Sequence, residues 1–202
     1  IVQEMVDSRV SGILFTRAYG NPVCSPTRAC IQTGRYGLRT GVGNVTSSIS
    51  QPDDYDLPDE EVLLSELVRY GRPTAPIQYK CGAFGKWHLS KSTNYAHPIV
   101  NGYHRFQGVM GNVSLGAAGV GGDHYQWYKV DNLASPAWTN PTGFTRQFWQ
   151  SSVAGDNAAE WINALSKPFL AYVCFNAPHQ PLQVPPAECL NTTTSGELDA
   201  AR

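Results

Sequence analysis

The run from Phe169 to Phe175, with the sequence FLAYVCF, constrains the fold more than any other part of the chain. Seven apolar residues in succession are typical of a strand covered on both faces, which is how strands lie in parallel sheets. Lys167 and Pro168 separate this run from a segment with helical periodicity, Thr145 to Ser166. A helix followed closely by a buried strand is typical of alternating α/β folds. We therefore predict an α/β fold built on a largely parallel sheet.

The segment from Asp59 to Tyr70 has the clearest helical pattern in the sequence. It opens with three acidic residues, which suit the positive end of a helix, and Gly71 follows as a stop signal. Its apolar side chains recur at helical spacing and predict a face turned towards the core. The residues of this face are Val62, Leu63, Leu67 and Tyr70.

Other segments extend the alternation of helices and strands. Tyr79 to Leu89 predicts a buried strand that leads into a loop, and Gly12 to Tyr19 predicts a short strand. Ile1 to Arg9 has the pattern of a helix end, while Asn101 to Asn140 is rich in Gly, aromatic and polar residues and predicts loops and short strands. A chain of 202 residues is long enough for one compact domain with a sizeable core.

The composition argues against several classes of protein. A net charge of -1 gives no basic field for nucleic acid, and no apolar run of about 18 residues is present to form a transmembrane helix. Five cysteines are too few for a disulfide-built scaffold, and the lack of a CxxC pair argues against zinc. Cys30, Cys81 and Cys174 lie in apolar segments, where we expect them to act as small buried hydrophobes.

The segment from Cys24 to Arg28 has the sequence CSPTR and precedes a predicted helix that ends near Thr33, before Gly34. Pro26 suits the first turn of such a helix. The free backbone N–H groups and the dipole at a helix N-terminus favour an anion, and Arg28 is one turn further on. Taken alone, these residues predict a reactive cysteine, an anion site, or a buried cysteine beside a surface arginine.

Three motifs together resemble those of the sulfatase family. The first is the CxPxR pattern at 24–28, followed at fixed spacing by Thr-Gly-Arg at 33–35. The second is Gly85-Lys86-Trp87-His88-Leu89, which in the family usually ends in Gly where this chain has Ser90. The third, Asn176 to Pro181, is similar to the family's sulfate-side histidine loop. They occur in the family's order and span nearly the whole chain.

The resemblance implies a fold and a domain assignment. The fold would be an alkaline-phosphatase-like sandwich, with a mostly parallel central sheet flanked by helices and incomplete at both ends. Residues 1–202 would form part of the N-terminal sulfatase catalytic domain, without its first strand and without a later strand that carries metal ligands.

The resemblance also implies a chemistry, sulfuric ester hydrolysis of the arylsulfatase type. A maturation enzyme would oxidise Cys24 to formylglycine, whose hydrate offers one hydroxyl to attack sulfur and a second to expel sulfate. Arg28 and Lys86 would be its positive partners, Lys86 also binding sulfate. His88, two residues from Lys86 and on the same side of an extended segment, would take the hydrate's proton. His179 follows a strand's carboxyl end and would bind sulfate and protonate the leaving oxygen.

The same resemblance implies that a divalent cation, usually calcium, is bound at the site. Of the residues in this chain only Cys24, in its oxidised form, would be a ligand, because the family's carboxylate pairs are not found where expected. Asp53 and Asp54 fall in a Pro-flanked loop that we interpret as a solvated turn. Since calcium needs hard oxygen ligands, we expect this chain alone to bind metal weakly and to turn over little substrate.

The substrate and the setting are less closely specified. His179 to Pro185 is similar to the arylsulfatase B-like branch, whose members act on sulfated sugars. Four aromatic residues are candidates either for stacking on sugar or aryl rings or for packing the rim of the domain; they are Tyr125, Trp127, Tyr128 and Trp138. Glycosylation sequons begin at Asn44, Asn112 and Asn191. The family implies a lysosomal, secreted or periplasmic protein.

Two other functions stay open at this point. Related enzymes with the same nucleophile hydrolyse phosphonate or phosphate monoesters. A non-catalytic, sulfatase-like chain that only binds sulfated glycans would keep Cys24 unmodified.

Overall fold

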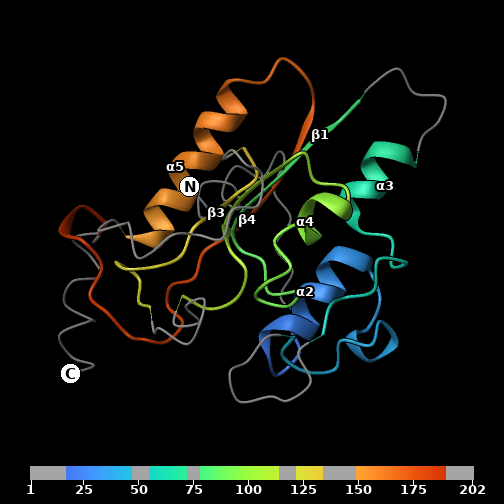
Figure 1. Ribbon diagram of the computed structural model, residues 1–202, viewed down its shortest axis with the longest axis horizontal. Coiled ribbons are helices and arrows are strands. Elements are labelled where there is room, and N and C mark those ends of the chain that lie inside the picture. Colours follow the sequence, from blue (N-terminus) through green and yellow to red (C-terminus); the bar gives the residue numbers. More distant parts are fainter. Residues whose placement is uncertain (1–16, 47–54, 72–77, 114–121, 134–148, 190–202) are drawn as a thin grey trace.

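A four-stranded sheet forms the centre of the molecule in a computed structural model of the chain (Figure 1). The structure describes residues 17–46, 55–71, 78–113, 122–133 and 149–189. β1 (Lys80–Lys86) lies between β2 (Arg105–Val109) and β4 (Phe169–Cys174) and is parallel to both. The short β3 (Val130–Asp131) is antiparallel to β2, which gives the order β3-β2-β1-β4. The predicted α/β fold with a mostly parallel sheet is confirmed.

Helices cover both faces of this sheet, as Figure 1 shows. α5 (Gln150–Asn163) lies on one face, where Phe84 of β1 packs against Trp161 with ring centroids 5.6 Å apart. The other face carries α2 (Cys24–Thr33), α3 (Leu64–Tyr70) and α4 (His97–Val100). The main core lies on this second face. Its largest side chains are Trp87, Tyr103, Phe106, Leu57, Leu63 and Leu89, all at most 1% exposed.

α2 ends as predicted, because Gly34 adopts a left-handed conformation with φ of 68° and donates its N–H to the carbonyl of Cys30. The start differs slightly from the prediction. Cys24 is the first residue of the helix and Val23 is its N-cap, so Cys24 does not lie before the helix N-terminus. Two short 3-10 helices, η1 (Gly37–Arg39) and η3 (Ala187–Cys189), complete the elements of the described residues.

The predicted helix 59–70 is wrong over its first five residues, because α3 begins only at Leu64. Leu63 keeps an extended backbone and lies fully buried in the core, while its N–H donates to the Glu66 carboxylate at 3.0 Å. The predicted apolar face is also wrong beyond Leu63. Val62, Leu67 and Tyr70 are 57–63% exposed, so the helical periodicity does not mark a buried face here.

The second predicted helix, 145–166, is shorter in the structure, where α5 covers 150–163 and residues 145–148 lie outside the described ranges. β4 forms as predicted, but the expectation that it is covered on both faces is wrong for the described residues. Phe169 is 42% exposed and the rest of the strand is half-buried. The reason is its place, since β4 is an edge strand of the described sheet.

The five cysteines are all free thiols. Cys81 is buried as predicted, and burial raises the pKa of its thiol to about 11. The same prediction is wrong for Cys30 and Cys174, which are half-buried. Cys174 lies at the edge of the sheet, and Cys30 accepts a hydrogen bond from the exposed Asn21 amide.

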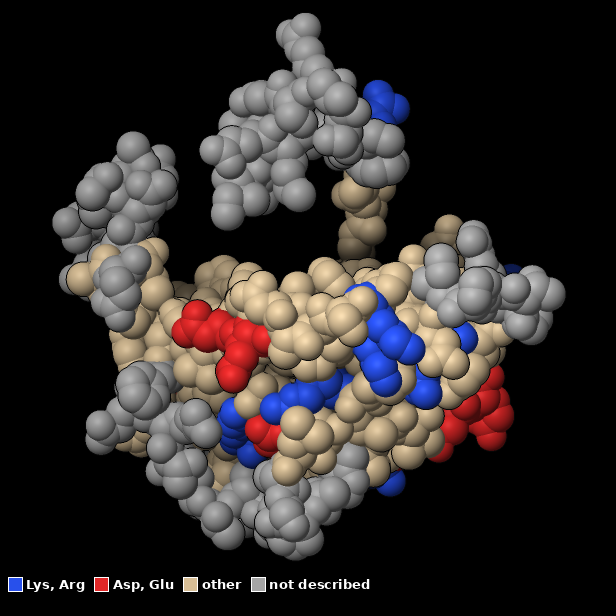
Figure 2. Space-filling view, turned by 90° about the horizontal axis from the view of Figure 1, so that it is seen from above, with Lys and Arg blue, Asp and Glu red and all other residues tan. Residues whose placement is uncertain are grey.

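Several sequence-based predictions fall outside the described residues. They concern 1–9 and most of 12–19, the pair at 53–54, Trp138 and the sequon at Asn191. Within the described ranges, no helix is long and apolar enough to cross a membrane. In Figure 2, Lys and Arg lie across the middle of the face, and Asp and Glu lie towards its sides and at one place among the basic groups.

Candidate active site

Cys24 lies half-buried at the start of α2, with its Sγ 3.1 Å from Nδ1 of His88. Val23 provides no side-chain cap, so the first N–H groups of the helix are not used by a capping side chain. The sequence distance between the two residues is 64, and it is β1 that carries His88 to the helix N-terminus. The structure thus joins the first two motifs in one site.

Lys86 is the last residue of β1 and only 3% exposed. Its ammonium group donates a hydrogen bond to Oδ1 of Asn112. Burial lowers the pKa of Lys86 to about 8, against the opposing effects of the Cys24 charge and hydrogen bond and with a further lowering by Arg28. A lysine with this pKa is still mainly protonated at neutral pH.

Arg28 joins α2 to the end of β1, because its Nη1 donates to the carbonyl oxygen of Lys86 at 2.7 Å. Its Nε is buried and has no hydrogen-bond partner among the described residues. The guanidinium also lines the pocket described below. Arg28 therefore supplies positive charge to the site and holds Lys86 in place from the helix side.

His88 is fully buried and has a positive φ of 56°, which is uncommon for a residue other than glycine. The extended conformation predicted for 86–88 therefore ends at His88. Backbone pairing with β2 continues past the end of β1, since Trp87 and His88 donate their N–H groups to the carbonyls of Val109 at 2.9 Å and Met110 at 2.8 Å. As expected, Lys86 and His88 both reach Cys24 while the Trp87 ring enters the core.

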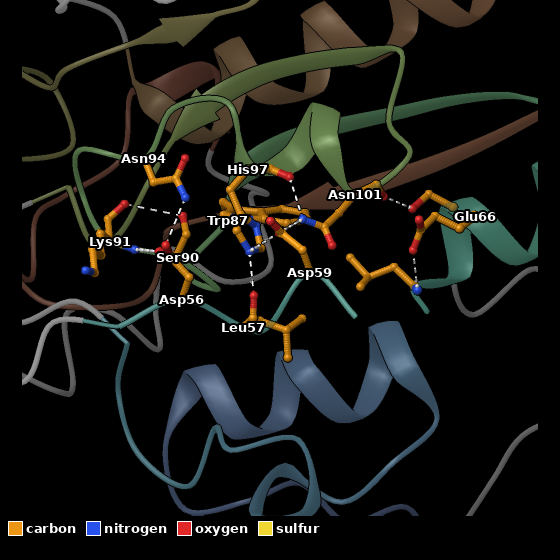
Figure 3. A network of polar contacts seen from close by, with 12 residues as sticks. Asp56, Leu57, Asp59, Glu66, Trp87, Ser90, Lys91, Asn94, His97 and Asn101 are labelled. Carbon is orange, nitrogen blue, oxygen red and sulfur yellow. Dashed lines mark hydrogen bonds and ion pairs between the residues drawn. The ribbon is translucent and has the colours of Figure 1, made fainter. Parts of the chain in front are cut away.

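The Trp87 ring is fixed by a buried histidine that the motifs do not include (Figure 3). Its Nε1–H donates to Nδ1 of His97 at 3.2 Å, and Nε2 of His97 is 2.8 Å from the carbonyl oxygen of Leu57. Because an indole N–H only donates and a carbonyl only accepts, these contacts require the proton of a neutral His97 on Nε2. The His97 ring thereby positions the residue between Lys86 and His88.

His179 enters the site from the loop after β4 and is exposed. Its N–H donates to the Asn176 carbonyl at 2.9 Å, and its Nδ1 is 2.9 Å from the Gln180 carbonyl. Nδ1 must therefore carry a proton, which leaves Nε2 as the ring nitrogen available to a ligand.

His124 supports this loop, and sequence reasoning missed it. It is 1% exposed, its ring stacks on Trp149 at 4.8 Å, and its Nε2 is 2.9 Å from the carbonyl oxygen of His179. Nothing in the sequence around His124 signals this role, because the contact joins segments 55 residues apart.

A pocket of about 560 Å³ opens between α2, the end of β4 and the His179 loop. Cys24, Arg28 and His179 line it directly, while Lys86 and His88 lie behind Cys24. The structure therefore brings all five predicted residues to one place, at the carboxyl ends of parallel strands. The other lining residues, which the motifs do not include, are Asn21, Pro22, Val23, Thr27, Ile31, Val45, Asn112, Tyr172 and Cys174.

The donor set does not match a calcium site. No group of three or more His, Cys, Asp or Glu side chains within the described ranges is placed to hold a metal ion. The pocket lining contains no carboxylate, whereas calcium takes six to eight oxygen ligands in typical sites. The described residues can bind an anion through Arg28 and Lys86, and they present Cys24 to it.

Two of the aromatic residues considered for stacking on a substrate, Trp127 and Tyr125, make contacts within the protein instead. Trp127 is 1% exposed and packs with Val109 and Val113 in a second core cluster, so its role is packing. Tyr125 donates its hydroxyl to the Val184 carbonyl at 2.8 Å and packs against Trp149.

Comparison with known proteins agrees with the geometry. The family model for sulfatases matches residues 3–196. Arylsulfatase G of Mus musculus is 30% identical over 186 residues, which cover 81% of this chain and 33% of that protein. Arylsulfatase J of Mus musculus is 28% identical over 185 residues, covering 86% and 28%. The chain thus spans about a third of the length of these relatives.

Solved structures show the same fold. The putative sulfatase yidJ from Bacteroides fragilis matches with a TM-score of 0.65 at 21% identity, covering 87% of this chain and 38% of that one. Ps i-CgsB, solved in complex with k-i-k-neocarrahexaose, matches with a TM-score of 0.59 at 22% identity, covering 81% and 36%. The predicted alkaline-phosphatase-like sandwich is confirmed for the described residues.

Proposed function

The chain belongs to the sulfatase family, and we propose that it carries the nucleophile site of an arylsulfatase-type sulfuric ester hydrolase. One observation carries the proposal: the cysteine of the CxPxR motif is hydrogen-bonded to His88 and lies beside Lys86 and Arg28 in a pocket. As part of the same proposal, residues 1–202 belong to the N-terminal catalytic domain.

The two cations of the site are suited to a sulfate ester. Arg28 faces the pocket from α2 and Lys86 reaches the Cys24 side chain from β1. Both groups are held by protein contacts before any ligand arrives, Arg28 by the Lys86 carbonyl and Lys86 by Asn112. Charges fixed in advance at low exposure stabilise a developing negative charge without reorganisation.

Position 24 fits a formylglycine, because the side chain lies at a helix N-terminus with a histidine at hydrogen-bond distance. When formed, that group supplies an oxygen nucleophile for sulfur together with a route for releasing sulfate. His88 is placed to take a proton from the side chain at position 24, since its Nδ1 already faces Sγ. Lys86 keeps its charge beside the same atom.

His179 acts on the opposite side of the pocket in this proposal. Its Nδ1–H is engaged by the Gln180 carbonyl, so Nε2, when it is protonated, is the atom that donates to a sulfate oxygen or to the leaving oxygen. The bond from His124 to the His179 carbonyl positions the loop for this task.

The described residues do not fit calcium, and we assign no step to a metal. The family resemblance implies calcium, with Cys24 in its oxidised form as one ligand. The further ligands would have to come from residues other than the described ones. Isothermal titration of the chain with calcium tests this point, and we expect weak binding at most. Tight binding would contradict it.

We propose sulfated carbohydrates or aryl sulfates as the substrate class. The names of the relatives support this class, since the chain resembles several arylsulfatases and an N-acetylgalactosamine-6-sulfatase of Homo sapiens that is 33% identical over 105 residues. A formylglycine-generating maturation enzyme as partner, and a lysosomal, secreted or periplasmic setting, belong to the same proposal.

Mass spectrometry of the peptide that contains position 24 tests the function. The chain is expressed with and without a formylglycine-generating enzyme, and we expect a loss of about 18 Da on Cys24 only when the enzyme is present. Cys24→Ala is the matched control and should show no loss. An unmodified Cys24 in the presence of the maturation enzyme would support the glycan-binding alternative and contradict the proposed hydrolase.

A second assay separates sulfate from phosphate chemistry. A longer form of the protein that hydrolyses an aryl sulfate is given aryl phosphate as a competitor. We expect the sulfate ester to be preferred, whereas preference for the phosphate would favour the phosphonate or phosphate monoester hydrolase.

A further inference from the structure

A cluster of basic side chains lies at the start of β1, at the end of the sheet opposite the pocket. Lys80 is the first residue of β1, Arg69 is in the last turn of α3, and His104 immediately precedes β2. All three side chains are half-buried. The starts of β1 and β4 lie in the upper part of Figure 1, and Figure 2 views the molecule from that side. Because Lys86 is the last residue of β1, the length of this strand, about 20 Å, separates the cluster from the pocket.

Two members of the cluster are held in place by backbone groups. The N–H of His104 donates to the Cys81 carbonyl at 2.8 Å, and the N–H of Cys81 donates to Nδ1 of His104 at 3.1 Å. A backbone N–H only donates, so the neutral imidazole carries its hydrogen on Nε2. Arg69 donates from Nη1 to the carbonyl of Gly102 at 2.7 Å, and its guanidinium lies 4.7 Å from the centre of the Tyr70 ring. The turn before β2 thus positions both side chains before any ligand binds.

The cluster has no acidic partner within the described residues. Neither Arg69 nor Lys80 makes an ion pair there, and the Lys80 ammonium and Nε2 of His104 make no hydrogen bond. Glu66, the acidic residue of α3, turns its carboxylate to the start of that helix instead. The sequence contains no Asp or Glu from 67 to 122. The donors that remain are therefore available to an external anion.

The neighbouring basic residues differ in this respect. Arg105 pairs with Asp131, whose carboxylate is also 3.4 Å from the Lys129 ammonium. Around His104, by contrast, burial and then the charges of Arg69 and Lys80 lower the pKa of the imidazole to about 4. The ring is consequently neutral at pH 7 and keeps its Nε2–H as a donor.

We propose that Arg69, Lys80 and His104 form a second anion-binding site, which takes a tetrahedral oxyanion in the form of a sulfate group on a carbohydrate chain. Each of the three side chains offers at least one N–H to an oxygen of the ligand, and two of them are charged. A sulfate group bound here is too far from Cys24 to react, so the site would hold a polysulfated chain while another sulfate group occupies the pocket. The carbohydrate rests on the proposed function, whereas binding of the oxyanion does not.

Nuclear magnetic resonance of the 202-residue chain with ¹⁵N-labelled histidine tests the site at pH 7. Sodium sulfate should shift the Nε2 resonance of His104 in a saturable way, whereas sodium chloride at equal ionic strength should not. His104→Gln identifies the resonance. A sulfated tetrasaccharide should saturate the same shift at a lower concentration than free sulfate. No saturable response to either probe would overturn the site, and a response to free sulfate alone would overturn its assignment to a carbohydrate chain.

Substitutions of the two charged residues measure their contributions. Arg69→Gln should weaken sulfate binding at least about fivefold and Lys80→Gln about threefold. The Lys80 ammonium has no hydrogen bond within the described residues, so Lys80→Gln keeps the test valid if Arg69→Gln does not fold. Arg39→Gln, the same change at an exposed residue of η1, is the matched control and should bind sulfate like the unaltered chain. Equal affinities in all four proteins would contradict the proposed site.

Arg28→Gln separates the second site from the pocket. The response of His104 to sulfate should persist in this variant, because Arg28 lies at the other end of the sheet. Loss of the response would mean that sulfate acts through the pocket, and the second site would be overturned. Failure of Cys24 to mature would defeat the hydrolase and leave these binding results intact.

Discussion

The two walls of the pocket are built in different ways. The nucleophile wall consists of Cys24 and Arg28 with Lys86 and His88 behind them, and the histidine wall consists of Tyr172, Cys174 and His179. Lys86 and His88 are at most 3% exposed and lie against the main core. On the other wall His179 is exposed, and Phe175, between β4 and the loop, is 53% exposed.

Hydrogen bonding shows the same contrast. Each residue from 86 to 88 has a side chain in contact with a partner from another element, and only Arg28 leaves a buried nitrogen unpaired on that wall. On and beneath the histidine wall, five buried polar atoms have no partner within the described residues. They are Oη of Tyr172, Nε2 of Gln150, Nδ1 of His124, and Nδ2 and Oδ1 of Asn176. The position of the nucleophile is thus set by the core, whereas His179 depends on a few loop contacts.

The largest expected difference between the walls is in stability. Trp87→Ala should lower the free energy of unfolding by about 3–5 kcal/mol, because the ring is fully buried between Tyr103 and Phe106. Phe175→Ala should cost less than about 1 kcal/mol, since half of that side chain is already exposed. Urea unfolding followed by fluorescence or circular dichroism measures both. Equal costs would contradict the contrast between the walls.

The same substitution at two buried histidines compares the walls directly. His97→Phe leaves the Trp87 indole N–H and the Leu57 carbonyl without their partner, and we expect a loss of about 2–4 kcal/mol. His124→Phe can keep the stacking on Trp149 and removes one bond, to the His179 carbonyl, so about 1–2 kcal/mol is expected. Urea unfolding of both variants gives the order, and a costlier His124→Phe would reverse the comparison.

The sequence predicts residues that belong to motifs or to short-range patterns, but not residues that act through long-range contacts. The motifs predicted one site for Cys24, Arg28, Lys86, His88 and His179, and short-range patterns located α2, β1 and β4. His97, His124 and Asn112 act through contacts with residues 10 to 55 positions away, and the sequence offers no local pattern for such contacts. Two wrong predictions have a common cause. Helical spacing at 62–70 and an apolar run at 169–175 were interpreted as burial, but burial depends on which elements pack there.

The two edges of the sheet extend the comparison away from the pocket. β4 has no partner on its outer side within the described residues, whereas β3 is fastened to β2 by an ion pair between Arg105 and Asp131. Burial alone would raise the pKa of Asp131, but hydrogen bonding and charge from Arg105 outweigh it and lower this pKa from 3.8 to about 2.

The lowered pKa of Asp131 predicts an acid-sensitive contribution to stability. The folded state binds the proton less readily than the unfolded state, so the contribution is present above pH 3.8 and is lost as pH falls towards about 2. Its size should be about 1–2 kcal/mol. Urea unfolding across this window should show a smaller loss of stability in Asp131→Asn than in the unaltered chain. Parallel pH profiles would show that the β3 edge is not held in this way.

The smallest effect is expected at Arg35, which closes the first motif but lies outside the pocket lining. Its guanidinium makes two contacts to the Glu61 carboxylate, at 2.5 and 2.7 Å, and its side chain is 51% exposed. The pair joins the end of α2 to the turn before α3, on the side of the core that carries the nucleophile wall.

Solvent screening limits such a pair, and a double-mutant cycle with Arg35→Ala and Glu61→Ala should give a coupling energy of about 0.5–1 kcal/mol. The rate at which Lys86 is acetylated, measured by peptide mass spectrometry, should be the same in both variants as in the unaltered chain, because neither residue lines the pocket. A changed rate would mean that the contact at the far end of α2 is transmitted to Cys24 at its start. The nucleophile wall would then depend on the whole helix as well as on the core beneath it.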